Sequence, residues 1–269
     1  MRETAHAKIN LALHVRRRRE DGYHEIETLF AFVNAGDSLT ARAASRDELT
    51  VTGEFAPQLA DPFGNIVAKA LAKLPRSQGL ALTLEKNLPV AAGLGGGSAD
   101  AGAVFRIVEA MHGLPGDWRE RAARLGADVP ACFESRMSIG RGTGTELETV
   151  ENDLAGMAVL LVNPRVPLAT GPVFAAWDGV DRGPLPDGPA SNIARKGRND
   201  LEAPAAGLCP VIADVLRGLN DTGPSASAMS GSGATCFALY EAEAERDRAA
   251  AIIVERNPDW WQMRGKLRP

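Results

Sequence analysis

Hydrophobic residues alternate with polar ones in several stretches and predict strands. The segment Ala5–Val15 alternates: one face carries Ala7, Ile9, Leu11, Leu13 and Val15, and the other carries His6, Lys8, Asn10, Ala12 and His14. A period of two is typical of a strand with one buried face, so we expect a half-buried strand here. The same reasoning predicts further strands over residues 25–33, 38–44, 49–54, 80–85 and 236–240, and a continuous apolar run predicts a buried strand over residues 157–162. The segment 25–33 also half-fits a helix.

Apolar residues at helical spacing predict helices between these strands. The predicted helices cover residues 65–74, 98–111, 117–125, 211–219 and 241–256. In the second helix Ser98 is a natural N-cap, and Asp100 in the first turn suits the helix dipole. Residues 179–190 are rich in Gly, Pro and Asp, so we expect an exposed and mobile loop.

A run of glycines joins the predicted strand 80–85 to the predicted helix 98–111. The run Gly93-Leu94-Gly95-Gly96-Gly97 brings bare backbone to a helix N-terminus, which is a favourable place for a phosphate group. The run lacks the Gly-Lys-Ser/Thr ending of a Walker A loop and the spacing of a dinucleotide fingerprint. The alternative is a tight turn, although three adjacent glycines exceed what a turn requires.

This loop resembles the phosphate loop of the GHMP kinases, the family of galactokinase, homoserine kinase and mevalonate kinase. Pro89 and Gly93-Leu94-Gly95 match the family pattern. The resemblance implies an α+β, two-domain fold, with a ribosomal-protein-S5-domain-2-like N-terminal domain and a ferredoxin-like C-terminal domain. The Glu-Asn-Asp-Leu break at residues 151–154 sets the expected boundary near Asn152, which gives domains of residues 1–152 and 153–269. The resemblance also implies ATP as cofactor, with Mg²⁺ on ligands that the sequence leaves unknown. The expected nucleotide-binding residues are Pro89, Val90, Ala91, Ala92, Gly93, Leu94, Gly95, Gly96, Gly97, Ser98 and Ala99, with Ser230, Gly231 and Gly233.

Two further motifs are similar to those that carry catalysis in the same family. The strand segment around Lys8 resembles the motif whose lysine lies beside the transferred phosphate, and the segment 125–130 resembles the one that carries the catalytic aspartate, here Asp128. On residues alone, Lys8 could lie on a solvated strand face and Asp128 could cap a helix. The Ser230–Thr235 loop is similar to the third family motif, although a tight turn before a strand explains it equally well.

A branch of the family that acts on a cytidine compound matches best, through Asp21-Gly22-Tyr23-His24. In that branch the tyrosine and histidine hold cytosine, and a Thr-x-x-x-Phe pair, here Thr170 and Phe174, closes on the base. Asn10 is expected to bind the substrate as well. The implied activity is ATP-dependent phosphorylation of the 2-hydroxyl of 4-diphosphocytidyl-2-C-methyl-D-erythritol, in the non-mevalonate route to isopentenyl diphosphate. The alternatives are another small-molecule kinase of the family, such as homoserine kinase, and a non-catalytic nucleotide-binding protein. For His24 the alternative role is a turn cap.

Composition and charge narrow the expected partners and location. The chain has 269 residues, 45% hydrophobic and 24% charged, with a net charge of −4, which argues against a nucleic-acid or anionic membrane surface. No protein partner is implied. Its three cysteines are scattered, and the N-terminus lacks a signal-peptide core, so we expect free thiols and a cytoplasmic enzyme. The four arginines of Arg16–Arg19 run into a turn signal, which favours a solvated hairpin tip over a phosphate clamp.

Overall fold

The computed structural model describes residues 1–59 and 64–269, which cluster into two compact units. Unit 1 consists of residues 1–7, 35–90 and 95–135, and unit 2 of residues 8–34, 91–94 and 136–269. The two long strands β1 (Arg2–Arg18) and β2 (His24–Ala44) contribute residues to both units. The division into domains of residues 1–152 and 153–269 stays a prediction.

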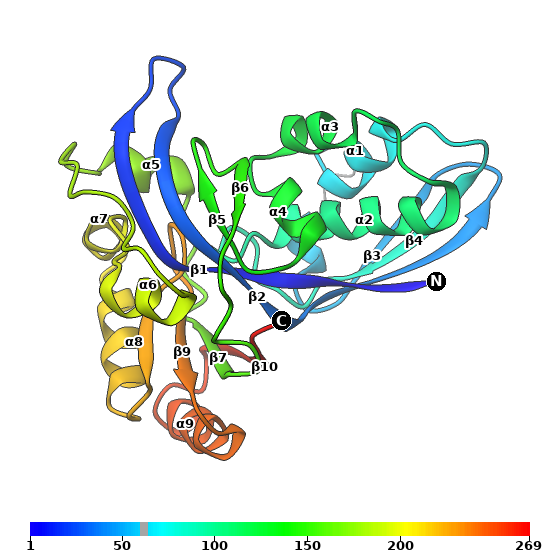
Figure 1. Ribbon diagram of the computed structural model, residues 1–269. Coiled ribbons are helices and arrows are strands. Elements are labelled where there is room, and N and C mark those ends of the chain that lie inside the picture. The colour runs from blue at the N-terminus through cyan, green and yellow to red at the C-terminus, as the bar shows by residue number, and fades with distance from the viewer. Residues whose placement is uncertain (60–63) are drawn as a thin grey trace. The chain divides into compact units, whose positions relative to one another are not determined.

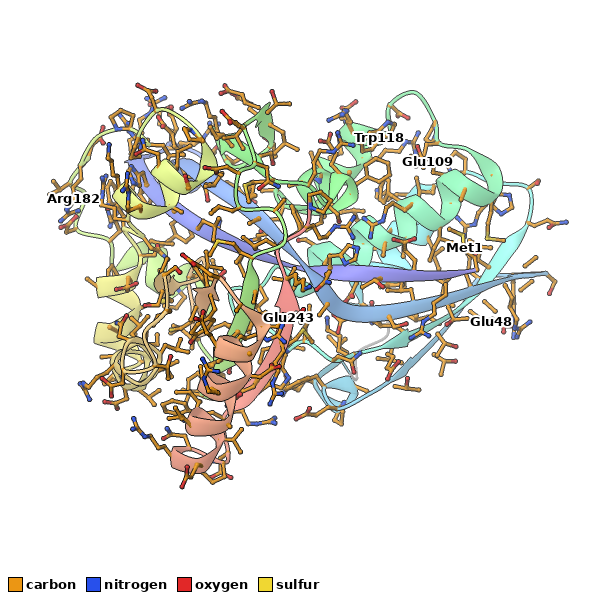
Figure 2. The ribbon with its side chains drawn as sticks, turned by 60° about the horizontal axis from the view of Figure 1, so that its bottom comes forward. Met1, Glu48, Glu109, Trp118, Arg182 and Glu243 are labelled. Carbon is orange, nitrogen blue, oxygen red and sulfur yellow. The ribbon has the colours of Figure 1, made fainter. Side chains whose placement is uncertain are left out.

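Unit 1 combines a small sheet with a group of helices. The strand β4 (Gly79–Glu85) pairs antiparallel with the end of β2 and parallel with β3 (Glu48–Thr52). The helices of the unit are η1 (Ala56–Leu59), α1 (Ile66–Lys73), α2 (Gly96–His112), α3 (Trp118–Leu125) and α4 (Val129–Glu134). Figure 1 shows α1, α2 and α3 grouped over β3 and β4. In Figure 2, Glu109 and Trp118 mark the helical side of this unit and Glu48 marks its strand side.

The buried residues of unit 1 follow the predicted periodicities. Leu80, Leu82 and Leu84 of β4 are buried, while Thr83 between them is exposed, as expected for a strand with one buried face. The apolar face of α2 is buried, and its Phe105 ring centroid lies 6.5 Å from that of Trp118. Helices of this kind are stabilised chiefly by burying such a face.

Unit 2 contains a four-stranded antiparallel sheet in the order β10-β7-β9-β8. Its strands are β7 (Ala158–Asn163), β8 (Ala226–Met229), β9 (Cys236–Tyr240) and β10 (Trp261–Lys266), and a separate hairpin of β5 (Ser138–Arg141) and β6 (Glu146–Thr149) extends β2. Its helices are α5 (Thr170–Ala175), α6 (Ala190–Lys196), α7 (Glu202–Leu208), α8 (Val211–Asn220) and α9 (Glu243–Arg256). The core of the unit packs α8 and α9 residues against β7 and β9.

Several expectations about the elements are corrected by the structure. The predicted strands 25–33 and 38–44 are one continuous strand, β2, because its pairing moves from β5 to β4 along its length. The first strand is buried on both faces: Lys8 is 4% exposed and Asn10 is 2% exposed. The strands β8 and β10 and the helices α6 and α7 were not predicted; each is ten residues or shorter, so its periodicity is weak.

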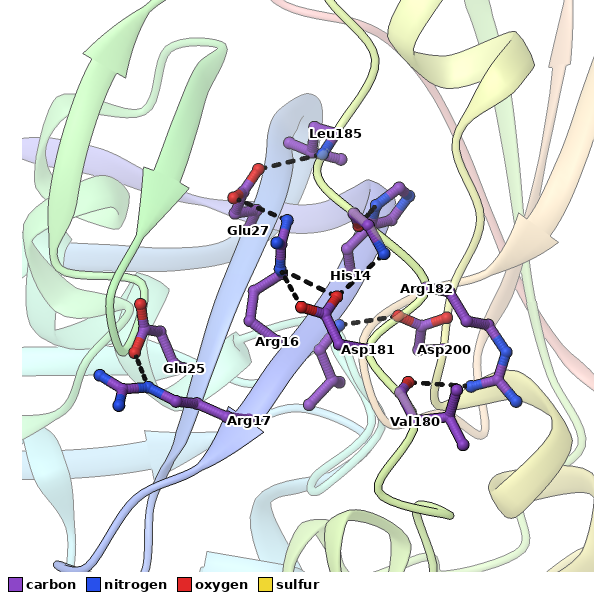
Figure 3. A network of polar contacts seen from close by, with 12 residues as sticks. His14, Arg16, Arg17, Glu25, Glu27, Val180, Asp181, Arg182, Leu185 and Asp200 are labelled. Atoms are coloured by element: carbon purple, nitrogen blue, oxygen red, sulfur yellow. Dashed lines mark hydrogen bonds and ion pairs between the residues drawn. The ribbon is translucent and has the colours of Figure 1, made fainter.

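The loop of residues 179–190 is mostly exposed, as expected, but it is also tied to β1 and β2 (Figure 3). Arg16 forms an ion pair with Asp181, and the Leu185 N–H donates to Glu27 Oε2 at 3.0 Å. His14 Nδ1 lies 3.0 Å from the Gly183 carbonyl. The loop is therefore held at its centre by side chains of the two strands.

The hairpin tip is confirmed, because β1 ends at Arg18, β2 begins at His24, and Arg17 and Arg19 pair with nearby acids. The three cysteines, Cys132, Cys209 and Cys236, are free and buried. Within residues 1–59 and 64–269, no helix has both the length and the apolar character that crossing a membrane requires.

Candidate active site

The glycine loop leads from β4 into α2, as the sequence predicts, but the helix begins earlier than expected. Gly95 takes the N-cap position with a φ of +59°, a conformation that favours glycine, and the Ala99 N–H donates to its carbonyl at 2.7 Å. Ser98 is therefore not the N-cap but the third helical residue. In the described chain no side chain caps this helix. The N–H groups of its first turn thus remain available to an anion.

Asp100 does not act as a first-turn dipole partner, which corrects the prediction. The side chain lies in the second turn of α2, is 1% exposed and forms an ion pair with Lys86 at 2.8 Å. Burial raises the pKa of Asp100 well above its ordinary value, and Lys86 opposes this rise.

The centre of the loop is attached to the Ser-Gly-Ser-Gly segment of unit 2. Ser230 Oγ donates to the Gly93 carbonyl at 2.8 Å, and the Thr235 N–H donates to the Ala92 carbonyl at 3.2 Å. Gly93 has a φ of +76°, and a Cβ there would lie 2.3 Å from the Ser230 carbonyl oxygen. The structure therefore brings together two glycine segments that are far apart in the sequence, and only glycine fits at their closest approach.

Lys8 lies on the interior side of unit 2. Its Nζ donates to Asn10 Oδ1 at 2.8 Å and lies 5.3 Å from the centroid of the Phe30 ring. Asn10 in turn donates from Nδ2 to Thr28 Oγ1 at 2.7 Å, and its backbone N–H donates to Ser230 Oγ at 3.2 Å. The Lys8 N–H donates to the Leu94 carbonyl at 3.0 Å, so the lysine is attached directly to the glycine loop.

Asp128 precedes α4, and Pro130 occupies the first turn of this helix. Across the residues that the structure describes, its carboxylate does not cap the helix, which removes the alternative role that the sequence left open. A Cβ added to Gly126, two residues earlier, would lie 3.6 Å from Ser98 Oγ. The turn that carries Asp128 therefore lies beside the first turn of α2, within unit 1. Lys8 belongs to unit 2.

A cluster of aromatic rings surrounds His24. The ring centroid of His24 lies 4.9 Å from that of Phe174 and 5.8 Å from that of Trp177, the latter edge-on at 82°. Tyr23, by contrast, is 63% exposed. Burial and the nearby Arg18 lower the pKa of His24, so this imidazole is neutral at pH 7.

Two polar atoms of this cluster are unsatisfied. Within the described part of the chain, His24 Nε2 and Trp177 Nε1 are buried and have no hydrogen-bond partner. A buried polar group without a partner is costly, and ligand sites are among the places where such groups occur. The cluster therefore combines aromatic rings inclined to one another with two buried polar atoms whose hydrogen bonds are not made within the described residues.

Helix α5, which is absent from the predicted helices, begins at Thr170 and places Phe174 one turn later. Thr170 Oγ1 lies 3.0 Å from Ser232 Oγ, so it contacts the glycine segment rather than the aromatic rings. Trp177 was missed at the sequence level, although it follows Phe174 at helical spacing. Arg18, also missed, donates to the carbonyls of Ala175 and Trp177 and so fixes the end of α5.

Metal ligands are not gathered into a cluster. Among residues 1–59 and 64–269, no three or more His, Cys, Asp and Glu side chains are placed to hold a metal ion together. A Mg²⁺ that arrives with a nucleotide takes most of its ligands from phosphate and water, so this donor set is compatible with such an ion.

Comparison with known proteins identifies the family. Residues 64–136 match the GHMP kinases N terminal domain and residues 187–259 match the GHMP kinases C terminal domain. A protein from Erythrobacter litoralis named 4-diphosphocytidyl-2-C-methyl-D-erythritol kinase is 69% identical over 269 residues, covering 98% of each chain. The chain belongs to the GHMP kinase family. A protein of the same name from Novosphingobium aromaticivorans is 68% identical, over 100% of this chain and 93% of its own.

Solved structures place this GHMP kinase in the same fold. A crystal structure of a 4-(cytidine 5'-diphospho)-2C-methyl-D-erythritol kinase matches this chain with a TM-score of 0.82 and 32% sequence identity. The match covers 100% of both chains. A homoserine kinase from Cytophaga hutchinsonii matches at a TM-score of 0.65 over 98% of this chain and 95% of its own, with 18% identity, and so shows the fold alone. The expected α+β GHMP kinase fold is confirmed.

Proposed function

We propose that this GHMP kinase transfers the γ-phosphoryl group of ATP to the 2-hydroxyl of 4-diphosphocytidyl-2-C-methyl-D-erythritol. The observation that carries the proposal is the full-length similarity to relatives that bear this enzyme's name, at 69% and 68% identity. The aromatic cluster around His24 supports it, because an imidazole whose pKa is lowered by burial and neighbouring aromatic rings suit a cytosine base. The cytoplasmic location remains a prediction.

The triphosphate of ATP fits the glycine loop by chemistry. The first turn of α2 has no side-chain cap among the described residues, and Gly95 and Gly96 leave its N–H groups open to an anion. ATP supplies the phosphoryl group, and its Mg²⁺ screens the charge of the phosphates. Ser98, in the same turn, is the hydroxyl that we assign to the phosphates or their metal.

Lys8 and Asp128 carry the transfer step in this proposal. Phosphoryl transfer depends mainly on placement and on charge stabilisation. The ammonium of Lys8, held by Asn10, would stabilise the negative charge on the transferred group. The carboxylate of Asp128 would accept the proton of the attacking hydroxyl. The hydroxyl oxygen of the substrate would then bond to the γ-phosphorus as the bond between that phosphorus and ADP breaks.

The cytosine end of the substrate would bind to the aromatic cluster of unit 2. Stacking on an aromatic ring contributes about 1–3 kcal/mol per base but does not distinguish one base from another. His24 Nε2, which is buried without a partner among residues 1–59 and 64–269, would supply the hydrogen bond that selects cytosine. Tyr23 and Phe174 would contribute the stacking faces, and Asn10 and Thr170 would complete the substrate contacts.

An acceptor assay tests the proposed function. Purified protein is mixed with ATP and Mg²⁺ and with the cytidine diphosphate compound, homoserine or mevalonate, and ADP release is measured. We expect turnover with the first acceptor alone. Turnover of homoserine or mevalonate at an equal or higher kcat/KM would overturn the assignment, and ATP binding without turnover of any acceptor would favour a non-catalytic nucleotide-binding protein.

A pair of acid-to-amide variants tests the role of Asp128. Asp128→Asn should lower kcat about 10²–10⁴-fold while the KM for ATP changes little, since general-base catalysis contributes a factor of that size. Asp117→Asn is the matched control, because Asp117 is an acid at the start of a neighbouring helix and pairs with Arg121 on the surface. If both variants retain wild-type turnover, Asp128 is not the base.

A further inference from the structure

A buried charged triad lies beneath the glycine loop and none of the preceding roles uses it. Lys86 Nζ donates to Asp37 Oδ2 and, at 2.8 Å, to Asp100 Oδ2. The three residues are 2%, 0% and 1% exposed, in that order, and all belong to unit 1. We call this set the Asp37–Lys86–Asp100 triad. Because a buried charge is costly, a cluster of three marks a place where position matters.

The triad is connected to the chain at both ends of the loop. On the entry side, Asp37 Oδ1 accepts from the N–H groups of Asn87 at 2.5 Å and Leu88 at 2.8 Å, immediately after β4. On the exit side, Asp100 is part of α2, the helix that follows the loop. Lys86 joins the two carboxylates, so one side chain links the residues before the loop to the helix after it.

The fit of Lys86 under the helix start is close. A Cβ added to Gly96 would lie 3.1 Å from Lys86 Nζ, which is tighter than an ordinary contact. The lysine backbone is fixed as well, because its N–H donates to the Thr52 carbonyl and its carbonyl accepts from the Phe55 N–H. The ammonium of Lys86 therefore lies directly against the first residue of α2, while its backbone is bonded just after β4.

The two acids of the triad share one ammonium, but they differ in their other hydrogen bonds. Asp37 uses both of its oxygens, for two backbone N–H groups and the lysine. Asp100 Oδ1, in contrast, is buried and has no hydrogen-bond partner in the part of the chain that the structure describes. Asp100 thus makes fewer hydrogen bonds than Asp37 among the described residues. Its side chain accepts a hydrogen bond from Lys86 at Oδ2.

We propose that the Asp37–Lys86–Asp100 triad holds the two ends of the glycine loop at the spacing that the ATP phosphates require, which makes Asp100 a positioning residue. The inference rests on the proposed function. Asp100 could act in two physical ways, by its position or by the negative field of its carboxylate. If Asp100 acts by position, its removal weakens nucleotide binding. If it acts only through its negative field, its removal strengthens the binding of an anionic nucleotide.

Asp100→Asn distinguishes these roles, because the amide keeps the shape and loses the charge-assisted bond to Lys86. We expect the Kd of Mg-ATP, measured by titration calorimetry at pH 7, to rise about tenfold, the size of effect that the loss of one charged hydrogen bond produces. Amide exchange of residues 96–99 in the free protein should become faster. The KM for ATP should rise in parallel, while the KM for the acceptor stays within about twofold of the wild-type value.

Glu3→Gln is the matched control, because Glu3 pairs with Arg106 at 2.7 Å in the same unit but away from the loop. The control should change none of these quantities. Asp37→Asn, which weakens the entry side, should raise the Kd of Mg-ATP as well, and it serves if Asp100→Asn does not fold.

An unchanged or lower Kd in Asp100→Asn would overturn the proposal, as would an equal rise in the KM values of both substrates. The calorimetric result stands apart from the proposed function. If the wild-type protein binds Mg-ATP but phosphorylates none of the acceptors, the function is wrong while the binding data still decide the role of the triad.

Discussion

The glycine loop is held by two sets of contacts that differ in chemistry. In unit 1, the residues at its ends are fixed by a buried ion cluster, in which Lys86 bonds to Asp37 and Asp100. In unit 2, the residues at its centre are fixed by neutral hydrogen bonds, chiefly from Ser230 and Thr235. The same short segment thus depends on charge at its ends and on close backbone packing at its centre.

The difference implies different sensitivities. Removing one member of a buried ion cluster leaves an uncompensated charge, whereas removing a neutral hydrogen bond leaves only an unsatisfied dipole. Charged contacts also respond to pH, while contacts between hydroxyl and peptide groups do not. We therefore expect the ends of the loop to be sensitive to charge and pH, and its centre to be sensitive to the volume of side chains.

The largest effect on stability is expected for Lys86→Met. The variant leaves Asp37 and Asp100 buried without the cation that pairs with them, which costs about 3–5 kcal/mol of unfolding free energy near pH 7. Urea denaturation followed by circular dichroism measures the loss. Lys69→Met, an exposed lysine of α1 in the same unit, is the control and should change stability by less than about 0.5 kcal/mol. Equal losses in the two variants would mean that the ion cluster is not special.

Gly93→Ala is expected to have the next largest effect and tests the centre of the loop. The residue has a positive φ, and its new Cβ would meet the Ser230 carbonyl oxygen at 2.3 Å, where only backbone could move aside. We expect a loss of about 2–4 kcal/mol in the same denaturation experiment.

Gly97→Ala is the matched control for this variant. A Cβ at Gly97 would make an ordinary contact of 3.5 Å with Ile66 Cγ2, and alanine is preferred within a helix. This variant should keep or raise stability by about 0.5–1 kcal/mol. A similar loss in both variants would remove the distinction between packed and open glycines of the loop.

These two regions also differ in how far the sequence predicted them. The glycine loop, the helix after it and Ser230 were found because glycine runs and helical periodicity are local signals. The triad was missed, and Asp100 was interpreted as a dipole partner, because Asp37, Lys86 and Asp100 are distant in sequence and each one looks like a surface residue. Trp177 carried a helical spacing signal that could have been used. Most other misses are short elements, such as β8, whose stability comes from pairing with β9.

Ser230→Ala should have a moderate effect. Ser230 Oγ accepts from the Asn10 N–H and donates to the Gly93 carbonyl, and the residue is fully buried. Its loss leaves one buried donor and one buried acceptor unsatisfied, which we expect to cost about 1–2 kcal/mol. Ser227→Ala, which removes a hydroxyl bonded to Asn220 at the surface, is the control and should cost less than half as much. A loss in Ser230→Ala as large as that in Lys86→Met would contradict the contrast between charged and neutral contacts.

The smallest expected effect is a pH dependence carried by Asp100. Burial raises the pKa of this carboxyl well above its ordinary value of 3.8, with Asp37 adding to the rise and Lys86 opposing it. In the window above 3.8 the native state therefore holds more protons than the unfolded chain, so stability falls as pH rises toward the folded pKa. Below 3.8 both states are protonated, and the contribution of Asp100 is fully present.

Denaturation midpoints of the wild type and of Asp100→Asn, measured from pH 3 to pH 8, isolate this contribution. The difference between the two proteins should change steadily in favour of the variant as pH rises above about 4, because the amide cannot lose a proton. The Ser230→Ala curve should run parallel to the wild type, since no titrating group is removed. The difference in denaturation midpoint between the wild type and Asp100→Asn could instead be independent of pH. That result would show that the Asp100 carboxylate is as well stabilised as the carboxylates on the surface. The charged ends of the loop would then be no more sensitive to pH than its neutral centre.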